Sequence, residues 1–207
     1  MGPEAERLLR EGLRQMGLAG PSEEVLKKFS TYLEELLKWQ KAYSLTGLRS
    51  QREVVIKGFL DSALYLLALP EGPLGVLDVG SGAGFPALPM KLLRPELRLS
   101  LLEPSRKRAA FLRHIIFTLG LGDIQVLQQR LQELAPGEAF DVATTRALLS
   151  CGDFLSQAGP HLRPGGLLLL SKGPRYKDEL EGLQARVIPV RLPLADLKRY
   201  LVVLKRP

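Results

Sequence analysis

The sequence predicts an α/β protein, with a doubly wound and mostly parallel sheet of Rossmann-like type behind an N-terminal helical extension. Two observations support this prediction. From Leu74 onward, short apolar runs alternate with helical segments, which is the pattern of successive strand–helix–strand units. The first of these runs leads into "VLDVGSGAGFP", from Val76 to Pro86, where a strand breaks into closely spaced glycines. Parallel sheets of this class hold their ligands at the carboxyl ends of the strands.

The first part of the chain is expected to form helices that pack on this core. Ser22 is a suitable N-cap for an amphipathic helix, because acidic residues follow it in the first turn. A further helix is expected over residues 52–69, and the "PEGP" segment that follows it marks a boundary. We therefore divide the chain into an N-terminal helical extension, residues 1–73, and a core, residues 74–207, which together form one compact unit.

The elements of the core are expected in regular alternation. Strands are expected over residues 75–80, 97–103, 124–129, 140–147 and 165–173, and helices over residues 86–94, 104–120 and 151–162. The last segment, residues 187–207, has the pattern of two strands joined by a polar turn. Because each helix follows one strand and precedes the next, a parallel sheet with right-handed crossovers is expected.

The composition is that of a globular chain with a surplus of positive charge. The 207 residues carry a formal net charge of +7, which favours a polyanionic partner, with nucleic acid foremost. No apolar run approaches the ~20 residues of a membrane span. Cys151 is the single cysteine, and the lack of an internal disulfide agrees with a reducing cytoplasm. We expect a cytoplasmic monomer with no membrane partner and no metal site.

The glycine loop defines the expected ligand site. Gly80 permits a tight turn, Gly82 lets a ligand approach the backbone, and Gly84 lets the following helix pack closely. Glu103 ends the next strand, about twenty residues on, where a carboxylate binds ribose hydroxyl groups in nucleotide-binding folds. The ligand is therefore expected to carry an adenosine-like ribose.

The spacing of the loop favours a cationic ligand over a diphosphate. A dinucleotide fingerprint requires G-x-G-x-x-G, but Phe85 occupies the third position of that pattern. Pro86 lacks a backbone N–H group that a phosphate would use. Asp78, just before the loop, would repel a diphosphate and attract the ammonium and sulfonium groups of S-adenosylmethionine. A purely structural turn in an unrelated α/β protein is the alternative interpretation.

A series of ordered motifs carries a resemblance to one family. "LLKWQKAYSLTGL" is similar to a helix leading into N-L-T, "KGFLDS" to H-x-x-D-S, and "DVGSGAGFPALP" to a cofactor loop. "EPSRKRAAFL", "QRLQEL", "TTRAL", "SKGP" and "RYLVV" follow in the same order. From about Leu33 to Leu204, the chain thus resembles the glucose-inhibited division protein B family, RsmG, bacterial methyltransferases of small-subunit ribosomal RNA. The fold this resemblance implies is that of class I S-adenosylmethionine-dependent methyltransferases.

The chain departs from the family's pattern at several motif positions. Gly58 stands where the family usually has histidine, and Ser44 replaces the asparagine of N-L-T. Gln132 and Glu103 replace a usual glutamate and a usual aspartate, and Ala87 stands where glycine or serine is common. The cofactor loop is otherwise intact, so the departures mainly affect the N-terminal motifs.

The resemblance implies methyl transfer to guanine N7 in 16S ribosomal RNA, in a loop near the decoding site. Guanine N7 carries a lone pair and no proton, so it can attack a sulfonium methyl group without a general base. Alignment of the two reactants is then the main requirement, and it can contribute ~7–11 kcal/mol. This agrees with the residues, because Cys151 lacks the Pro-Cys setting of cytosine methylation. His114 and His161 are expected on helices outside the site.

Three residues are candidates for positioning the substrate. Arg146 is expected to hold guanine O6, the cofactor carboxylate or a phosphate, but not N7, because a bidentate contact to O6 and N7 would occupy the nucleophilic lone pair. Asp61 is a candidate for the cofactor ammonium or the guanine amino edge, with an ion pair to Lys57 one turn away as the alternative. Lys172 is a candidate for a phosphate or base contact.

The expected binding residues form two groups. The cofactor group consists of Asp78, Gly80, Gly82, Phe85, Glu103, Leu131, Gln132 and Arg146. Within it, the glycines and Phe85 are expected at the methionine end, Glu103 at the ribose, and Leu131 and Gln132 at the adenine. The RNA group consists of Arg106, Lys107, Arg108, Arg113, Lys198 and Arg199, with Arg49 and Arg52 as further phosphate contacts.

Two other classes of function stay open from the sequence. Another RNA or small-molecule methyltransferase would share the cofactor site, although a small-molecule enzyme has no need of a net charge of +7. A non-catalytic protein that binds S-adenosylmethionine and RNA would keep the loop without turnover. Methyl incorporation into ribosomal RNA or into metabolites separates these interpretations.

Overall fold

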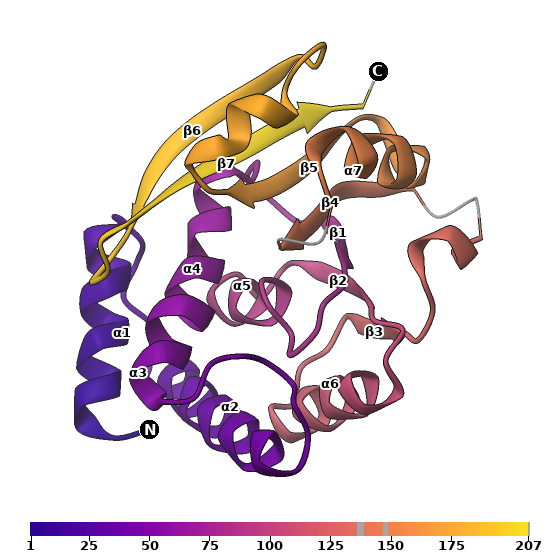
Figure 1. The fold of residues 1–207 in the computed structure, drawn as a ribbon. Helices are drawn as coiled ribbons and strands as arrows, with labels where there is room; N and C mark the ends of the chain where they lie inside the picture. Colours follow the sequence, from indigo (N-terminus) through magenta and orange to yellow (C-terminus); the bar gives the residue numbers. More distant parts are fainter. Residues whose placement is uncertain (136–138, 147–148, 207) are drawn as a thin grey trace.

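The computed structural model describes residues 1–135, 139–146 and 149–206, which form a seven-stranded sheet (Figure 1). The strands are β1 (Gly75–Val79), β2 (Arg98–Leu102), β3 (Ile124–Leu127), β4 (Phe140–Arg146), β5 (Leu162–Lys172), β6 (Ala185–Leu192) and β7 (Leu197–Lys205). Their order across the sheet is β3-β2-β1-β4-β5-β7-β6. β1 to β5 pair in parallel, whereas β7 runs antiparallel between β5 and β6. The expected mostly parallel sheet and terminal hairpin are therefore confirmed.

Helices cover both faces of this sheet. They are α1 (Pro3–Gln15), α2 (Glu23–Ala42), α3 (Gln51–Glu53), α4 (Asp61–Ala63), α5 (Ala87–Leu93), α6 (Arg106–Thr118) and α7 (Cys151–Ala158). α5 and α6 pack on one face, because the chain moves outward from β1 to β2 and then to β3. α7 packs on the other face, because the chain moves in the opposite direction from β4 to β5. The strand order thus reverses between β1 and β4, which makes this a topological switch point.

The helix expected over residues 52–69 is a composite of several helical forms. After α3, the chain forms a π-helix over Val54–Leu60, then α4, and then a 3₁₀-helix over Leu64–Ala68. Inside the π-segment, the carbonyl of Gly58 accepts a hydrogen bond from the Ser62 hydroxyl at 2.6 Å. Helical periodicity in the sequence does not reveal such a widened segment, because α- and π-helical turns place apolar residues at similar spacings. Short π-segments are frequent at functional sites.

The N-terminal helices contribute to the same core as the sheet. Leu9 of α1 and Phe29 of α2 are fully buried in one hydrophobic cluster with Val76 of β1. Ser22 caps α2 as expected, since its side chain accepts a hydrogen bond from the N–H of Val25 at 3.3 Å. The position of the boundary between extension and core, after "PEGP", stays a prediction.

Cys151 begins α7 and is fully buried. The strand expected over residues 140–147 ends at Arg146, and residues 147–148, which complete the "TTRAL" motif, lie outside the described residues. In the described part of the chain, no helix is long and apolar enough to cross a membrane.

Candidate cofactor and substrate site

The glycine loop lies at the switch point, directly after β1. Gly80, Gly82 and Gly84 have positive φ angles of 75°, 57° and 95°, which residues with a Cβ atom rarely adopt. The N–H groups of Gly80 and Ser81 donate to the carbonyl of Leu102 at the end of β2, at 2.8 and 3.1 Å. The expected tight turn is therefore present, and it is tied to the neighbouring strand.

Gly84 permits close packing of helices against the loop. A Cβ atom at this position would lie 2.5 Å from the Tyr32 hydroxyl and 2.5 Å from Leu88 Cδ1. The Tyr32 hydroxyl also donates to the carbonyl of Ala83 at 2.5 Å. The sequence predicts the close packing of the following helix, α5, at Gly84, but it does not reveal that α2 is bonded to the loop as well.

Glu103 joins the end of β2 to the glycine loop. It is 3% exposed, and its carboxylate accepts hydrogen bonds from the N–H of Gly82 at 2.8 Å and from the N–H of Ser105 at 2.9 Å. These bonds fix the carboxylate beside Gly82, at the place where the ribose is expected. Its contact with the ribose stays a prediction.

Asp78 is fully buried, and neither of its carboxylate oxygens has a hydrogen-bond partner among the described residues. Burial raises the pKa of Asp78 from 3.8 to about 8, and the charge of Glu103 acts in the same direction. The nearby Ser81, the N–H of Ala87 and the charge of Arg146 oppose this rise in pKa only in part. An unpartnered carboxyl group beside the loop fits a ligand that brings positive charge, as the methionine end of S-adenosylmethionine does.

Replacement of Asp78 by asparagine is expected to change how stability depends on pH. Because the folded-state pKa lies above 3.8, the folded protein still holds a proton between about pH 4 and 8, where the unfolded chain has already released it. The free energy of unfolding of the wild type should fall as pH rises through this range, with a contribution of up to ~1.4 kcal/mol per pH unit from this group. Asp78→Asn removes that contribution. Denaturant unfolding of both proteins at pH 5 and pH 7.5, without cofactor, measures it, and parallel pH dependences would contradict the assignment.

Two pockets meet at Gly80. The first, of about 290 Å³, is called the Leu131 pocket and is lined by Val79, Gly80, Leu102, Pro104, Gln129, Arg130, Leu131, Gln132, Leu149 and Gln157. The second, of about 230 Å³, is called the Phe85 pocket and is lined by Leu45, Thr46, Gly80, Ser81, Gly82, Ala83, Phe85, Arg108 and Arg146. The residues expected at the adenine therefore line one pocket, and those expected at the methionine end line the other.

Arg146 lines the Phe85 pocket, and the buried Asp61 lies beside it. The guanidinium carbon of Arg146 lies 5.7 Å from the centre of the Phe85 ring, and its Nη2 lies 3.4 Å from Asp61 Oδ2. The alternative of an Asp61–Lys57 ion pair is wrong, because Lys57 pairs with Glu53 at 3.2 Å instead. Lys57 is four residues away from both Glu53 and Asp61, so helical spacing alone does not choose between these two carboxylates. Arginines that reach Asp61 from the sheet take the place of Lys57 there.

Lys172 lies apart from Arg146, although both residues end neighbouring strands. Arg146 aligns with Ser171 on β5, so the adjacent Lys172 points to the opposite face of the sheet. There its ammonium group donates to the carbonyl of Leu149 at 2.7 Å and pairs with Glu179 at 2.7 Å. Its side chain is 11% exposed, and the carboxylate of Glu179 already balances its positive charge. A role in phosphate or base contact stays a prediction.

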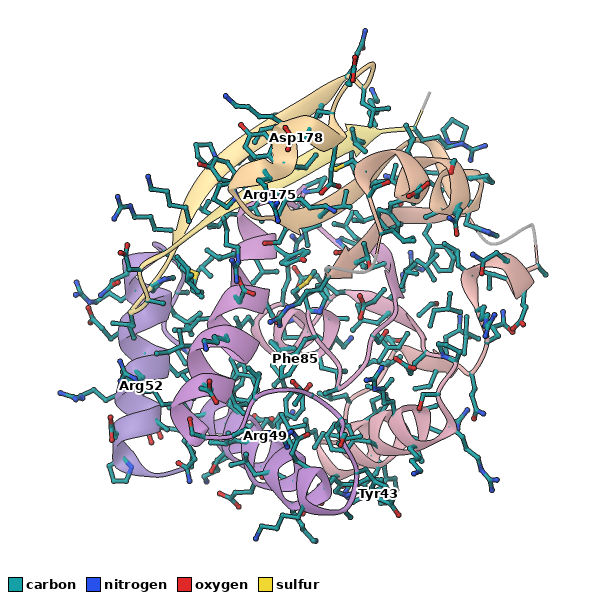
Figure 2. All side chains as sticks on the ribbon, in the orientation of Figure 1. Tyr43, Arg49, Arg52, Phe85, Arg175 and Asp178 are labelled. Carbon is teal, nitrogen blue, oxygen red and sulfur yellow. The ribbon has the colours of Figure 1, made fainter. Side chains whose placement is uncertain are left out.

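The expected RNA-binding residues belong to elements on either side of the Phe85 pocket. Arg108 of α6 lines the pocket itself, and the ammonium of Lys107 lies 5.5 Å from the ring centre of Tyr43. Arg106 and Arg113 share α6, with Arg113 donating to Gln128 at 3.3 Å, and Lys198 and Arg199 belong to β7. Arg49 and Arg52 are exposed, and Figure 2 shows Arg49 and Tyr43 below Phe85.

Sequence reasoning missed Gln40, which organises one wall of the Phe85 pocket. Its side-chain oxygen accepts from the N–H groups of Leu45 and Thr46, at 3.1 and 3.0 Å, and its amide nitrogen donates to the carbonyls of Thr46 and Leu48. The "SLT" motif is a signal for the pocket-lining residues Leu45 and Thr46. No local pattern singles out Gln40 itself.

Gly58 explains how the ring of Phe85 is accommodated. A Cβ atom at position 58 would lie 2.9 Å from Phe85 Cζ, so the ring fills the space that any side chain there would need. Gly58, which departs from the expected motif, thus packs directly against the ring of Phe85.

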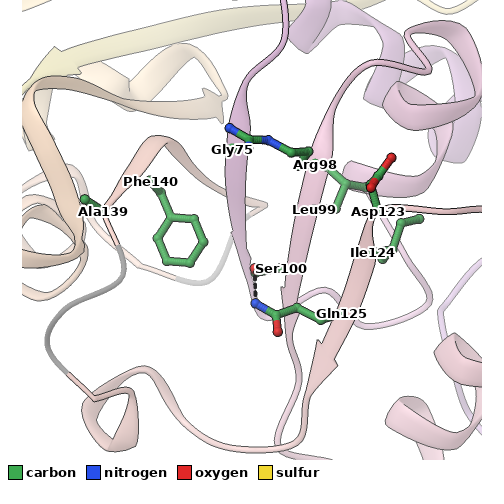
Figure 3. Close-up of a pocket in the computed structure, with 9 residues that line it drawn as sticks. All are labelled: Gly75, Arg98, Leu99, Ser100, Asp123, Ile124, Gln125, Ala139 and Phe140. Carbon is green, nitrogen blue, oxygen red and sulfur yellow. Dashed lines mark hydrogen bonds between the residues drawn. The ribbon is translucent and has the colours of Figure 1, made fainter.

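A larger hollow, of about 530 Å³, lies at the other end of the sheet (Figure 3). It is formed where β1 to β4 begin, and Gln125 donates to the Ser100 hydroxyl at 2.7 Å within it. None of the predicted site residues lines it. In the described residues, no group of three or more histidine, cysteine, aspartate or glutamate side chains is suited to hold a metal ion.

The comparisons with known proteins show the family of this chain. The family model GidB, rRNA small subunit methyltransferase G, matches residues 25–194. A relative from Roseiflexus castenholzii, named Ribosomal RNA small subunit methyltransferase G, is 36% identical over 194 residues, covering 87% of this chain and 83% of its own. A relative of the same name from Xanthomonas axonopodis pv. citri is 34% identical and covers 100% of this chain and 97% of its own.

Among solved structures, a SAM-dependent methyltransferase from Aquifex aeolicus is similar with a TM-score of 0.57. It is 18% identical, and the match covers 82% of this chain and 97% of that one, so the likeness shows the fold alone. The expected fold, enzyme class and cofactor are confirmed: the protein is an S-adenosylmethionine-dependent rRNA methyltransferase. The chain belongs to the GidB family, the rRNA small subunit methyltransferases G.

Proposed function

We propose that this protein methylates N7 of one guanine in 16S ribosomal RNA, in a loop near the decoding site. The observation that supports this most directly is the Phe85 pocket, which adjoins the Leu131 pocket at Gly80 and has Arg146 in its wall. In this proposal, Leu131 and Gln132 hold the adenine, Glu103 holds the ribose, and the glycine loop holds the methionine end. The remainder of the Phe85 pocket then receives the base. The RsmG-like motifs supply the choice of guanine N7 and of the RNA.

The residues around the Phe85 pocket fit a reaction that needs alignment and no proton transfer. When bound, S-adenosylmethionine supplies the electrophilic methyl group on its sulfonium. The Phe85 ring offers an apolar wall to a purine, and Arg146 donates to guanine O6, which leaves the N7 lone pair free. The buried carboxyl group of Asp78, whose pKa is raised to about 8 without ligand, is stabilised in its ionised form by the positive methionine end and attracts it in turn. His114 is bonded to Glu35 at 2.6 Å on the α2–α6 side, so it is not placed to act as a base.

The proposal is tested with 16S ribosomal RNA, free or in small-subunit particles, from cells that lack this protein. Incubation with the purified enzyme and S-adenosylmethionine should add one methyl group at N7 of a single guanine near the decoding site. Mass mapping of RNA fragments locates the group, and selective cleavage at N7-methylguanine identifies the atom. Methylation of another base, of another atom or of metabolites alone would contradict the proposal. Comparing free RNA with particles shows which of the two is the substrate.

The cellular setting is part of the same proposal. We place the reaction in the cytoplasm and assign it to a monomer that binds the RNA through its basic residues. The formal net charge of +7 supports an RNA partner, and the buried free thiol of Cys151 is compatible with a reducing compartment.

A further inference from the structure

We infer that Asp61 is a positioning residue that fixes Arg146 over the Phe85 ring, and that Arg199 balances its charge from β7. The inference rests on the proposed function, because that function gives Arg146 its target. It differs from a direct contact of Asp61 with the cofactor or the base. Asp61 acts, in this view, only through Arg146.

Two arginines face the carboxylate of Asp61. Asp61 is 3% exposed, and each of its oxygens faces a different guanidinium group. Arg199 Nε donates to Oδ1 at 3.0 Å, and Arg146 Nη2 lies 3.4 Å from Oδ2. A buried carboxylate requires such partners, because ionised groups are costly to desolvate. Because Asp61 is 3% exposed and each of its oxygens already faces a guanidinium group, an ammonium group or a guanine amino group has little access to it.

The same helical stretch anchors Arg146 at a second point. Nη2 of Arg146 also donates to the carbonyl of Lys57, within the π-segment, at 2.7 Å. The Lys57 carbonyl and the Asp61 carboxylate thus both contact Nη2 of Arg146. Among the described residues, neither Nε nor Nη1 has a hydrogen-bond partner. A guanidinium group carries five N–H donors. One corner of the group is therefore fixed, while the other donors stay available to a substrate.

The anchored guanidinium has a defined orientation towards the pocket. Its carbon lies 5.7 Å from the centre of the Phe85 ring, within the range in which an arginine is attracted to an aromatic face. The ring is itself fixed, because it packs against Gly58 and lies 5.8 Å from the ring of Tyr32 in a stacked arrangement. The π-segment, α4 and β7 together therefore determine where Arg146 points.

The charge balance of this cluster explains the role of Arg199. One carboxylate shared by two guanidinium groups leaves a net positive charge beside the pocket, which suits an RNA substrate. Because Arg199 pairs with the same carboxylate, Asp61 does not fully neutralise the charge of Arg146. Arg199, assigned from the sequence to RNA phosphates, is thus assigned a second role in holding Asp61.

The test is a double-mutant cycle of Asp61→Asn and Arg146→Ala, measured on ribosomal RNA methylation. Asparagine keeps the shape of Asp61 but removes its charge, so Arg146 loses its ionic anchor. We expect Asp61→Asn to lower kcat by roughly 10- to 100-fold, the size of effect that a displacement of about 1 Å produces. The KM for RNA and the calorimetric affinity for S-adenosylmethionine should stay nearly unchanged. In the Arg146→Ala background, Asp61→Asn should cause little further loss, because its effect passes through Arg146.

Asp141→Asn is the matched control. Asp141 lies at the opposite end of β4, where it pairs with Arg163 at 2.6 Å, so this variant removes a comparable pair away from the pocket and should keep full kcat. Full kcat in folded Asp61→Asn, losses that multiply in the double variant, or a loss of cofactor affinity would each overturn the inference. Product mapping of the wild type tests the proposed function separately, since an unexpected product would refute that function whatever the cycle shows.

Discussion

Arg146→Ala is expected to lower kcat for ribosomal RNA methylation by roughly 100- to 1000-fold, as the loss of one electrostatic donor at a reacting centre does. Arg146 is the charged side chain that faces the Phe85 ring, at 5.7 Å, and it lines the same pocket as Gly80 and Gly82. Without it, the base has no donor for O6 and turns more freely relative to the methyl group. Single-turnover methylation at saturating RNA and cofactor measures the effect.

A conservative variant and a pH profile sharpen this prediction. Arg146→Lys keeps the charge but loses the planar fork of donors, so it should recover only part of kcat. Since N7 needs no deprotonation, kcat at saturating cofactor should show no essential base between about pH 6 and 9. Saturation matters, because the raised pKa of Asp78, about 8, makes cofactor affinity itself depend on pH. Full activity of Arg146→Ala would refute the proposed mechanism.

The two histidines provide the complementary control. His114 is bonded to Glu35 at 2.6 Å, and His161 lies in a short 3₁₀ turn after α7. The double variant His114→Gln with His161→Gln should therefore keep most of its activity. If this variant folds, binds RNA and is inactive, a histidine takes part in the chemistry after all.

Gly82→Val is expected to abolish detectable binding of S-adenosylmethionine in a protein that still folds. A Cβ atom at Gly82 has no neighbour closer than the carbonyl of Gly80, at 3.8 Å, so the valine side chain projects into the Phe85 pocket that Gly82 lines. The positive φ of 57° adds backbone strain of about 1–2 kcal/mol. Calorimetric titration measures binding, and circular dichroism confirms the fold.

Gly120→Val is the control that distinguishes a blocked cofactor site from backbone strain as the cause of lost binding in Gly82→Val. Gly120 follows α6 with a φ of 60°, and a Cβ atom there meets nothing within 4 Å. This variant should carry a similar strain but bind the cofactor normally. Unchanged affinity in Gly82→Val would place the ligand elsewhere, and an equal loss in Gly120→Val would attribute the effect to instability.

The parts of the site that sequence predicts are those set by local spacing and strand order. The glycine loop and Glu103 each follow a strand and Arg146 ends one, and parallel strands bring their carboxyl ends to one edge of the sheet. Lys172 follows the same logic and is nevertheless separated from Arg146. The alternation of side chains along a strand decides this, since a shift of one residue reverses the face.

The parts that sequence does not predict depend on distant partners. Asp61 and Arg199 are 138 residues apart in the chain, and no periodicity relates them. Spacing of four residues on a helix suggests an Asp61–Lys57 pair, but two arginines from the sheet compete more strongly for a buried carboxylate. The π-segment and the packing of Phe85 on Gly58 likewise depend on tertiary contacts, which override helical preference.

The dependence of the Tyr43–Leu48 loop on one side chain has a consequence for its motion. Gln40 supplies hydrogen bonds to Leu45, Thr46 and Leu48, so rotation of a single amide releases them together. We expect such a loop to open as a unit, because its bonds to Gln40 break together, whereas β1 opens only with global unfolding. Backbone amides of Leu45 and Thr46 would then exchange with solvent at one common rate. A structured RNA could thereby reach a pocket of about 230 Å³ while the sheet behind it stays closed.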